Sequence, residues 1–404
     1  MAPARHVIIA GAGVAGLTAA LALTRIGLRV TVLEQAAKLE ETGAGIQIGP
    51  NAARVLIALG LRERLASSVM TPEAIRVMAG GSGREIVRIP LGGTAEGRYG
   101  APYWTIHRGD LQAALADAVK ATQDITLKLA TCVEDFATHV NGLTVHARNA
   151  QGATEDLAFA LIGADGVWST LRGRLQARPQ PKFRHRTAWR ALIPAEQVAE
   201  VFRQPLVHLW LGPGGHLVHY PVKAGRLINI VAIVHDDWSK TGWSAAAERA
   251  EIMRHFGGFA WDNSARVLVA LPERWLKWAL YDRAEPFRGD SAPVTLIGDA
   301  AHPMLPFLAQ GAGLAIEDAA VLAAMLADYG DDPADALRAY EGARWHRAYR
   351  AQQASRMQGR IYGMSGPEAF IRNVAMRAMG GERLLSRFDW LYSWRPPERF
   401  ERMS

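Results

Sequence analysis

The N-terminal part of the chain alternates short apolar runs with one longer apolar segment. Val7–Ala10 is a short apolar run, and the glycine-rich turn Gly11–Gly16 follows it. Leu17–Ile26 has the length of a helix, and Arg29–Leu33 is a second short apolar run. Strand, tight turn, helix and strand in this order predict a βαβ unit.

Two further helices and two strands are expected in the first half of the chain. A helix is predicted at Asn51–Leu59, because Gly60 follows it in the usual C-terminal position. An amphipathic helix is predicted at Asp110–Ala121, where the first aspartate has helix-capping chemistry. Strands are expected around Leu143–Ala147 and Ala158–Ile162.

From about Arg184 the pattern changes to short alternating runs. Three of them, separated by glycine and proline or glycine and lysine, are Leu206–Leu211, His216–Val222 and Arg226–Val234. Turn residues at this spacing predict an antiparallel meander.

The first pattern then returns, with a strand at Val294–Ile297, a long helix from Gly313 and a helical C-terminal region. A chain that leaves one domain, builds a sheet and comes back contains an inserted domain. We therefore predict an α/β fold. Residues 1–183 and 286–404 form a Rossmann-like domain with C-terminal helices, and residues 184–285 form an inserted antiparallel-sheet domain.

The composition is that of an ordinary soluble protein. Apolar residues make up 49% and charged residues 21% of the 404 positions, a length that favours two packed domains. Cys132 is the only cysteine, which excludes an internal disulfide and multi-cysteine metal sites. The sequence shows neither a signal peptide nor an apolar run of about 20 residues. We expect a cytoplasmic protein without stable membrane association.

The net charge of +7 is concentrated near the C-terminus. Between Glu341 and Ser404 there are 12 arginines and six acidic residues, which leaves six of the seven excess charges in this segment. The arginines are scattered among aromatic and apolar residues, and no nucleic-acid motif accompanies them. They indicate a solvated helical surface or, alternatively, a surface that steers anionic substrates, and no nucleic-acid partner is expected.

The hexapeptide Gly11–Gly16 reads G-x-G-x-x-G between a strand and a helix. Gly11 permits the tight turn, Gly13 lets a pyrophosphate approach the backbone, and Gly16 allows close packing of helix and strand. Glu34 closes the second strand, where it can accept hydrogen bonds from a ribose diol. Together these residues predict a site for an adenine dinucleotide.

A second glycine-lined helix start decides which dinucleotide is bound. The segment Gly298–Pro303, GDAAHP, follows a buried strand and places Asp299 before a helix. That helix opens with Gln310, Gly311, Ala312 and Gly313. A second site far from the first suits a long ligand, and FAD fits, with its ribitol near Asp299 and its ring near residues 310–313.

With a third motif, the chain resembles a known family. Residues 163–172, GADGVWSTLR, match the D-G-x-x-S-x-x-R element of class A flavoprotein monooxygenases. The glycine turn with Glu34 and the GDAAHP segment occur in the same order in that family. The resemblance covers nearly everything from Arg5 to about Tyr392. It points to the branch that contains salicylate hydroxylase, 3-hydroxybenzoate 6-hydroxylase and 6-hydroxynicotinate 3-monooxygenase.

The resemblance implies roles for several residues. The acid that matches Asp165 serves FAD and nicotinamide binding, and the one that matches Asp299 holds the ribitol. Arg108 is expected to contact the flavin, and residues 44–47, which end at Gln47, to line its ring. His302 is interpreted as mainly structural.

The resemblance also implies the chemistry. NADH or NADPH binds transiently, because no second dinucleotide fingerprint is present. The reduced flavin reacts with O2 to give a C4a-hydroperoxide that hydroxylates a small aromatic substrate, without a protein-bound metal. Resemblance to the hydroxybenzoate hydroxylases also implies a homodimer.

The inserted sheet supplies the candidate substrate residues. Because residues two apart on a strand share a face, His216 and Tyr220 point together while His219 points away. His216 and Tyr220 match polar residues that meet the phenolic substrate in the 3-hydroxybenzoate and 6-hydroxynicotinate enzymes. A histidine with a pKa near neutrality can take a phenol proton. An ordinary half-buried pair remains the alternative. Arg190 could bind a substrate carboxylate or serve domain packing.

The expected function is hydroxylation of a phenolic acid such as 3-hydroxybenzoate or salicylate. Gln47 and Phe307 stand where the 6-hydroxynicotinate enzyme has histidines, which disfavours a hydroxypyridine carboxylate. A monooxygenase or epoxidase that acts on a larger natural product, a flavin oxidoreductase without oxygen insertion, and a regulatory flavin-binding protein stay open.

Overall fold

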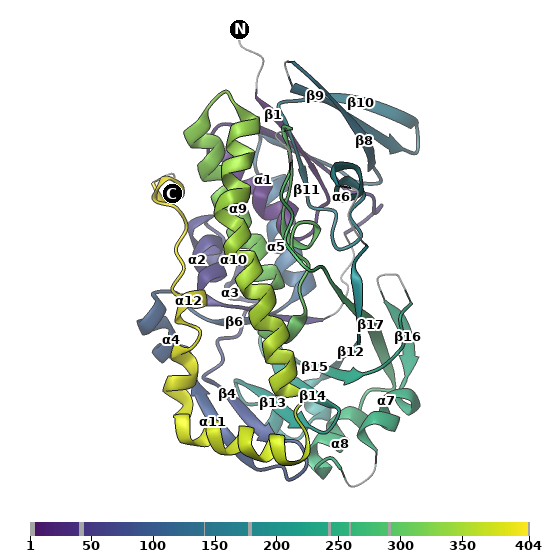
Figure 1. Ribbon diagram of the computed structural model, residues 1–404, viewed down its shortest axis with the longest axis vertical. Coiled ribbons are helices and arrows are strands. Elements are labelled where there is room, and N and C mark those ends of the chain that lie inside the picture. The colour runs from purple at the N-terminus through teal and green to yellow at the C-terminus, as the bar shows by residue number, and fades with distance from the viewer. Residues whose placement is uncertain are drawn as a thin grey trace.

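The chain folds around two sheets that lie toward opposite ends of an elongated molecule (Figure 1). The computed structural model describes residues 5–39, 44–140, 142–176, 180–240, 244–257, 260–289 and 292–402. The longest helix, α10 (Pro333–Tyr362), runs along the molecule and spans the distance between the two sheets. Within these ranges, no helix is long and apolar enough to cross a membrane.

The first sheet is parallel throughout and has the strand order β18-β11-β1-β2-β7. Its strands are β1 (His6–Ala10), β2 (Arg29–Leu33), β7 (Ile125–Lys128), β11 (Ala160–Gly163) and β18 (Val294–Leu296). The predicted βαβ unit is confirmed. Its helix α1 (Val14–Thr24) begins three residues before the expected Leu17, because extended Gly13 is its N-cap.

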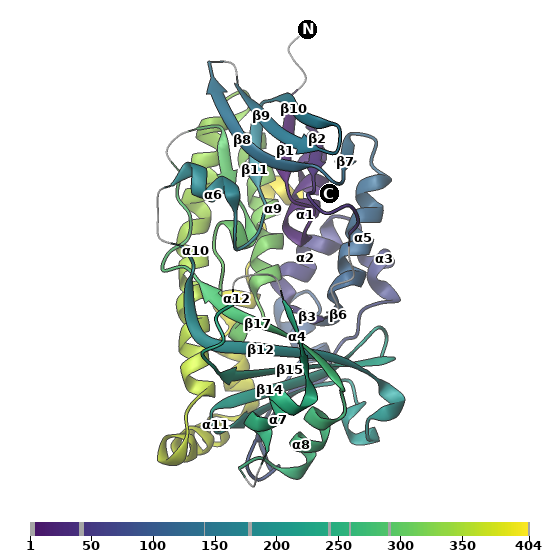
Figure 2. The ribbon, with the colours of Figure 1, turned by 90° about the vertical axis from the view of Figure 1, so that its right-hand side faces the viewer.

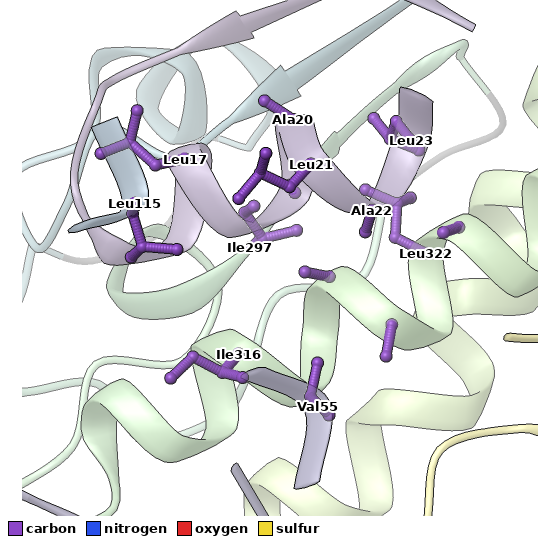
Figure 3. Packing of buried hydrophobic residues seen from close by; sticks show 14 of the residues in the cluster. Leu17, Ala20, Leu21, Ala22, Leu23, Val55, Leu115, Ile297, Ile316 and Leu322 are labelled. Carbon is purple, nitrogen blue, oxygen red and sulfur yellow. The ribbon is translucent and has the colours of Figure 1, made fainter. Parts of the chain in front are cut away.

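Helices cover one face of this sheet, and a small sheet covers the other. The helices are α1, α5 (Arg108–Lys120) and α9 (Gly311–Tyr329), which share one apolar core (Figure 3). α1 and α9 both present buried alanines, which lets the two helices pack closely. The small antiparallel sheet consists of β8 (Cys132–His139), β9 (Gly142–Asn149) and β10 (Gly152–Ala158).

The second large sheet has the strand order β16-β17-β12-β15-β14-β13-β4-β5. Its central strands β17, β12, β15 and β14 can be followed in Figure 2. In chain order its strands are β4 (Ala74–Ala79), β5 (Glu85–Pro90), β12 (Lys182–Pro194), β13 (Leu206–Gly212), β14 (Gly215–Val222), β15 (Leu227–His235), β16 (Ala245–Glu248) and β17 (Arg274–Asp282). The predicted antiparallel meander is confirmed in β13, β14 and β15.

Two strands of this sheet come from outside the predicted inserted segment. β4 pairs in parallel with β13, and β5 pairs with β4, so residues 74–90 extend a sheet whose other strands begin at Lys182. The predicted limits of the insertion, 184 and 285, stay a prediction. The pairing of β4 with β13 nonetheless ties the N-terminal part of the chain to the sheet.

The large sheet has two chemically different faces. Trp189, Leu217 and Ile230 lie on the outer face, which packs on α7 (Arg249–Phe256) and α8 (Asn263–Ala270). Since alternate strand residues point to opposite faces, their neighbours lie on the face directed toward the parallel-sheet domain. We call this second face the inner face.

The remaining elements connect and cover these layers. β3 (Gly45–Ile48) and β6 (Trp104–His107) form a two-stranded ladder. The other helices are α2 (Pro50–Ala58), α3 (Arg62–Ala66), α4 (Gly92–Tyr99), α6 (Thr170–Leu175), α11 (Gly366–Ser386), α12 (Asp389–Tyr392) and α13 (Glu398–Glu401). Short 3₁₀ turns lie at Ala195–Gln197, Glu200–Phe202, Gly298–Ala300 and Pro306–Leu308.

A buried ion network joins α9 to α10. Glu317 and Asp318 on α9 are both fully buried. Arg344 of α10 contacts Glu317 at 2.8 Å and Asp318 at 2.6 Å, and Arg347 forms two bonds of 2.6 Å with Glu317. Asp318 also bonds His302 at 2.6 Å. Some of the C-terminal arginines are therefore internal, contrary to the expected solvated surface, because acidic partners on α9 neutralise them.

We expect Arg344→Met to be strongly destabilising. The variant leaves the carboxylates of Glu317 and Asp318 with fewer partners in a buried site, and loss of one member of such a pair costs about 3–5 kcal/mol. Urea unfolding followed by circular dichroism measures the change in the free energy of unfolding.

The matched control is Arg338→Met on the same helix. Arg338 pairs with Asp335 at the surface, with side chains 56% and 47% exposed, so its loss should cost less than about 1 kcal/mol. Equal stability of the Arg344 variant and the unsubstituted protein would contradict the structural role of the network.

Candidate functional site

The glycine turn after β1 has the shape that a dinucleotide phosphate requires. Gly11 adopts φ +107°, and a Cβ there would lie 2.5 Å from the carbonyl oxygen of Ala164. A Cβ on Gly16 would lie 1.9 Å from the Gly11 carbonyl oxygen. A Cβ on Gly13, by contrast, would meet nothing within 4 Å. The turn is closed against the sheet and open at Gly13, where the N-terminus of α1 presents free N–H groups.

Glu34 lies at the end of β2 and holds this turn in place. Its carboxylate accepts hydrogen bonds from the backbone N–H of Ala12 at 2.7 Å and of Ala36 at 2.9 Å. The carboxylate is partly exposed, and its remaining lone pairs are placed to accept a ribose hydroxyl. Gln112 of α5 supports the same turn by donating to the Ala12 carbonyl oxygen at 2.8 Å, a contact that sequence reasoning missed.

Asp299 and Arg108 meet on the side of the domain that faces the large sheet. Asp299 lies in the 3₁₀ turn after β18, and Arg108 is the first residue of α5. The Asp299 side chain reaches solvent, yet desolvation by the surrounding protein raises the pKa of its carboxyl group. The charges of His302 and Arg108 act in the opposite direction and lower that pKa. A Cβ on Gly311 would lie 3.9 Å from Asp299 Oδ1, so the start of α9 adjoins this carboxylate.

The start of α9 presents backbone rather than side chains. Gly311 and Ala312 are partly exposed and lie in the first turn, whose N–H groups lack intrahelical partners. Gln310, in contrast, is fully buried, and its Oε1 accepts a hydrogen bond from Asn51 at 3.0 Å. A Cβ on Gly313 would lie 2.8 Å from that oxygen. The Gln310 side chain therefore packs inside the helix start and supports it from within.

The second motif is joined to the third by an arginine. Arg172, only 3% exposed, donates to the carbonyl oxygens of Ala300 at 2.8 Å and Ala301 at 2.6 Å. Asp165 Oδ2 accepts from the backbone N–H of Leu171 at 3.2 Å, while its Oδ1 is buried without a partner. Burial raises the pKa of Asp165, and the hydrogen bonds that it accepts lower it.

His302 belongs to the buried ion network rather than to an open site. It is 2% exposed and bonds Asp318, which also accepts from the backbone N–H of Gly298 at 2.8 Å. Burial opposes the charge of Asp318, but His302 and Arg344 lower its pKa to about 2. Asp318 therefore stays ionised and fixes the turn that carries Asp299.

His216 and Tyr220 lie together on the inner face of the large sheet. Both are 3% exposed and lie on β14. His216 lies between two aromatic rings, with centroid distances of 5.5 Å to Phe307 and 5.0 Å to Tyr362. His219 points to the other face, where its ring stacks on His208 at 4.4 Å.

The surroundings of His216 and Tyr220 keep both groups neutral. Burial lowers the pKa of His216 to about 3, and the positive charge of Arg186 contributes. Burial raises the pKa of Tyr220, against the opposing effects of Arg190 and Gln47. The near-neutral pKa on which a proton-accepting role for His216 depends is therefore not what this environment favours.

Three polar residues near this pair were missed by sequence reasoning. Asn229 Oδ1 accepts from the backbone N–H of Gly45 at 2.7 Å, and Tyr103 donates to Gln47 Oε1 at 2.7 Å. Tyr362 closes the side of His216. Asn229 had a signal in the sequence, because it is a polar residue in the middle of an otherwise apolar strand stretch, Leu227–Val234. Tyr103 and Tyr362 had none, since they reach the site only through the fold.

The arrangement fits FAD, judged by the chain's own geometry. An open glycine turn, the partly exposed carboxylate of Glu34 and a second helix start with an adjoining carboxylate lie along one domain. The inner face of the large sheet lies against the ladder β3–β6 and the turn Pro306–Leu308, through Gly45 and Phe307. The structure brings Gln47 to Tyr220 and Asp299 to Arg108 and the start of α9, whereas the Gln310 side chain points inward.

Comparisons with known proteins agree with this geometry. A family profile described as "FAD binding domain" matches residues 4–355. The chain is 36% identical over 391 residues to 3-amino-4-hydroxybenzoate 2-monooxygenase PtmB3 of Streptomyces platensis, which covers 96% of each chain. It is 34% identical over 388 residues to 3-hydroxybenzoate 6-hydroxylase of Polaromonas naphthalenivorans strain CJ2, again 96% of each chain.

A solved structure of a salicylate hydroxylase substrate complex superposes with a TM-score of 0.81 at 25% identity, and covers 99% of this chain and 98% of the other. The chain therefore belongs to the FAD-binding-domain family, among the FAD-dependent aromatic monooxygenases.

Proposed function

We propose that this protein hydroxylates a small phenolic acid with NADH or NADPH and O2. The observation that carries the proposal is the inner face of the large sheet. There His216 and Tyr220 lie buried between aromatic rings, beside the segment that ends at Gln47. The relatives named above act on hydroxybenzoates, which are planar rings with a hydroxyl and a carboxylate.

We assign FAD binding to the residues of the cradle. Gly11, Gly13 and Gly16 shape the turn for the pyrophosphate, and Glu34 accepts from the adenosine ribose. At the other end, Asp299 accepts from the ribitol and Arg108 adjoins the flavin. The backbone of residues 311–313 lies at the ring, and Gln310 keeps this helix start in position. We assign Asp165, in the loop that follows β11, to the same cofactor site.

When bound, FAD supplies the redox chemistry, because it takes electrons from the nicotinamide nucleotide and activates O2. The tasks of the chain are to bind the ring, orient it and exclude water. Phe307 and Tyr362 cover His216 with apolar surface, and Tyr103 lies beneath Gln47. These side chains keep the reacting ring dry.

His216 acts in this proposal as a neutral hydrogen-bond acceptor. Its low pKa means that the imidazole is uncharged near pH 7, so one ring nitrogen can accept the phenol O–H. That bond moves electron density onto the ring without full proton transfer. Tyr220, whose pKa is raised, stays protonated and can donate to the substrate.

The aromatic enclosure favours one small ring over bulkier substrates. Phe307, Tyr362 and Tyr103 occupy the space beside the inner face. A larger natural product remains the second candidate, and a hydroxypyridine carboxylate is disfavoured by Gln47 and Phe307. The class is tested by oxidation of NADH and NADPH with 3-hydroxybenzoate, salicylate, 3-amino-4-hydroxybenzoate and 6-hydroxynicotinate, with mass analysis of products. A failure of all four to accelerate oxidation and gain oxygen would contradict the proposal.

Asp299→Ala should purify without flavin. The substitution removes the carboxylate that adjoins the start of α9, and with it the acceptor for the ribitol hydroxyls. Flavin per chain is measured by the ratio of the flavin absorbance at roughly 450 nm to the protein absorbance at roughly 280 nm.

Asp117→Ala on the exposed side of α5 is the matched control, and it should stay yellow. An Asp299 variant with full flavin and unchanged activity would remove Asp299 from the cofactor site.

His216→Ala should lower kcat/KM for hydroxylation roughly tenfold to a hundredfold while FAD content is kept, since a buried hydrogen bond of this kind is worth about 1–3 kcal/mol. Because its pKa is about 3, His216 does not titrate between pH 6 and 8. The pH profile in that window should therefore keep its shape in the variant.

His235→Ala, at the exposed end of the neighbouring strand β15, is the control and should behave like the unsubstituted protein. If the acid side of the profile moved in the His216 variant, the imidazole would be a proton acceptor after all.

A further inference from the structure

Arg190 occupies the inner face of the large sheet. It lies on β12, where Trp189, Ala191 and Ile193 point to the outer core. The strand alternation places Arg190 on the opposite side, the side of His216 and Tyr220. The two side chains interact electrostatically, because the positive charge of Arg190 acts to lower the pKa of the Tyr220 phenol.

The Arg190 side chain is partly buried, and its guanidinium lies against an aromatic ring without a counter-ion. It lies over the ring of Trp278 at 5.1 Å, and its Nε is buried without a hydrogen-bond partner. In the part of the chain that the structure describes, no carboxylate lies within ion-pair distance of it. Burial lowers its pKa, and the charge of Arg108 adds to that effect.

Several other enclosed arginines have partners, although Nη1 of Arg186 is also buried without one. Arg344 is neutralised by Glu317 and Asp318, Arg356 bonds Asp282 at 2.8 Å, and Arg172 donates to carbonyl oxygens. A partly desolvated charge without a partner is unfavourable, and a bound anion would offset that cost. Arg190 stands apart from the structural arginines by this criterion.

The register of the sheet places Arg190 across from the phenol-binding pair. Arg190 lies opposite Val231 of β15, which lies opposite Val218 of β14. Val218 is the residue between His216 and Tyr220 on the inner face. Two strand spacings separate β12 from β14, about 10 Å between backbones, and side chains from both reach into that interval. One ring with a carboxylate at one side and a hydroxyl at the other spans the gap.

We infer that Arg190 binds the carboxylate of the substrate and selects phenolic acids over neutral phenols. The inference rests on the proposed function and names the group that recognises its substrate class. The planar guanidinium can bind both carboxylate oxygens, and Trp278 fixes its orientation. His216 and Tyr220 then receive the hydroxyl.

Arg186 is the competing cation on the same strand. It lies near His216 and over the ring of Phe307 at 5.4 Å. It already donates to the carbonyl oxygen of Gly359 at 3.5 Å. Its side chain is directed toward α10, so the structure favours Arg190.

The test is a binding titration that needs no turnover. Each acid (3-hydroxybenzoate, 3-amino-4-hydroxybenzoate and 6-hydroxynicotinate) and its neutral amide is added to the FAD-loaded protein, and the change in flavin absorbance gives Kd. The unsubstituted protein should bind at least one acid more tightly than its amide. Arg190→Met should weaken that acid by on the order of thirtyfold or more and leave the amide within about threefold.

Two further variants sharpen the test. Arg190→Lys keeps the charge but loses the paired geometry, so its acid affinity should lie between those of the unsubstituted protein and Arg190→Met. Arg186→Met removes an equal charge from the same strand and should keep the preference for the acid.

Several results would overturn the inference. They are equal affinity of acid and amide in the unsubstituted protein, an unchanged acid affinity in Arg190→Met, and loss of the preference in Arg186→Met alone. Loss of FAD from both Arg190 variants would assign the arginine to the cofactor instead. Arginine-dependent binding of an acid that is never hydroxylated would leave the inference standing and remove the proposed reaction.

Discussion

The fold of the site depends on the buried charges between α9 and α10. Two adjacent carboxylates, Glu317 and Asp318, lie in the second turn of α9, the helix whose start is assigned to the cofactor in the proposed function. Arg344 and Arg347 neutralise them from α10, while Asp318 reaches back to His302 and the backbone N–H of Gly298. One network therefore sets both the start of α9 and the turn that carries Asp299. A buried ion pair adds little net stability, but its directional bonds fix the relative position of the elements that it joins.

The large sheet can have two roles because its two faces differ. Its outer face forms part of a hydrophobic core, and its inner face lines the proposed substrate site. On the outer face, tryptophans and aliphatic residues of the sheet pack against α7 and α8. The inner face carries two arginines, an asparagine, a histidine and a tyrosine among aliphatic residues. Buried polar atoms without partners occur on both faces, as with the indole N–H of Trp189, so such atoms alone do not mark a site. The inner face differs because its polar groups converge, across neighbouring strands, on the domain that binds the cofactor.

Local pattern was enough to predict the parts that local chemistry controls. The turn Gly11–Gly16, the strands beside it and the meander β13–β14–β15 follow from glycine placement and strand alternation, and so does the shared face of His216 and Tyr220. Long-range features were not accessible. The joining of β4 to β13, the bridge from Arg172 to Ala300, and the inward turn of Gln310 depend on contacts between segments far apart in sequence. The low pKa of His216 likewise follows from enclosure by Phe307 and Tyr362. The residues next to His216 in the sequence give no sign of this enclosure.

The distribution of charge follows the chemistry that each end of the site must perform. In the proposed binding mode, carboxylates stand where sugar and ribitol hydroxyls would need acceptors, at Glu34 and Asp299. Two cations, Arg108 and Arg190, stand near the proposed ring end, and the charge of Arg108 lowers the pKa of Arg190. Like charges near one another repel, and a nearby anion offsets that repulsion. Under the inference above, a negatively charged substrate would relieve that repulsion and a neutral phenol would not, so the electrostatics of the site would discriminate between the two ligands.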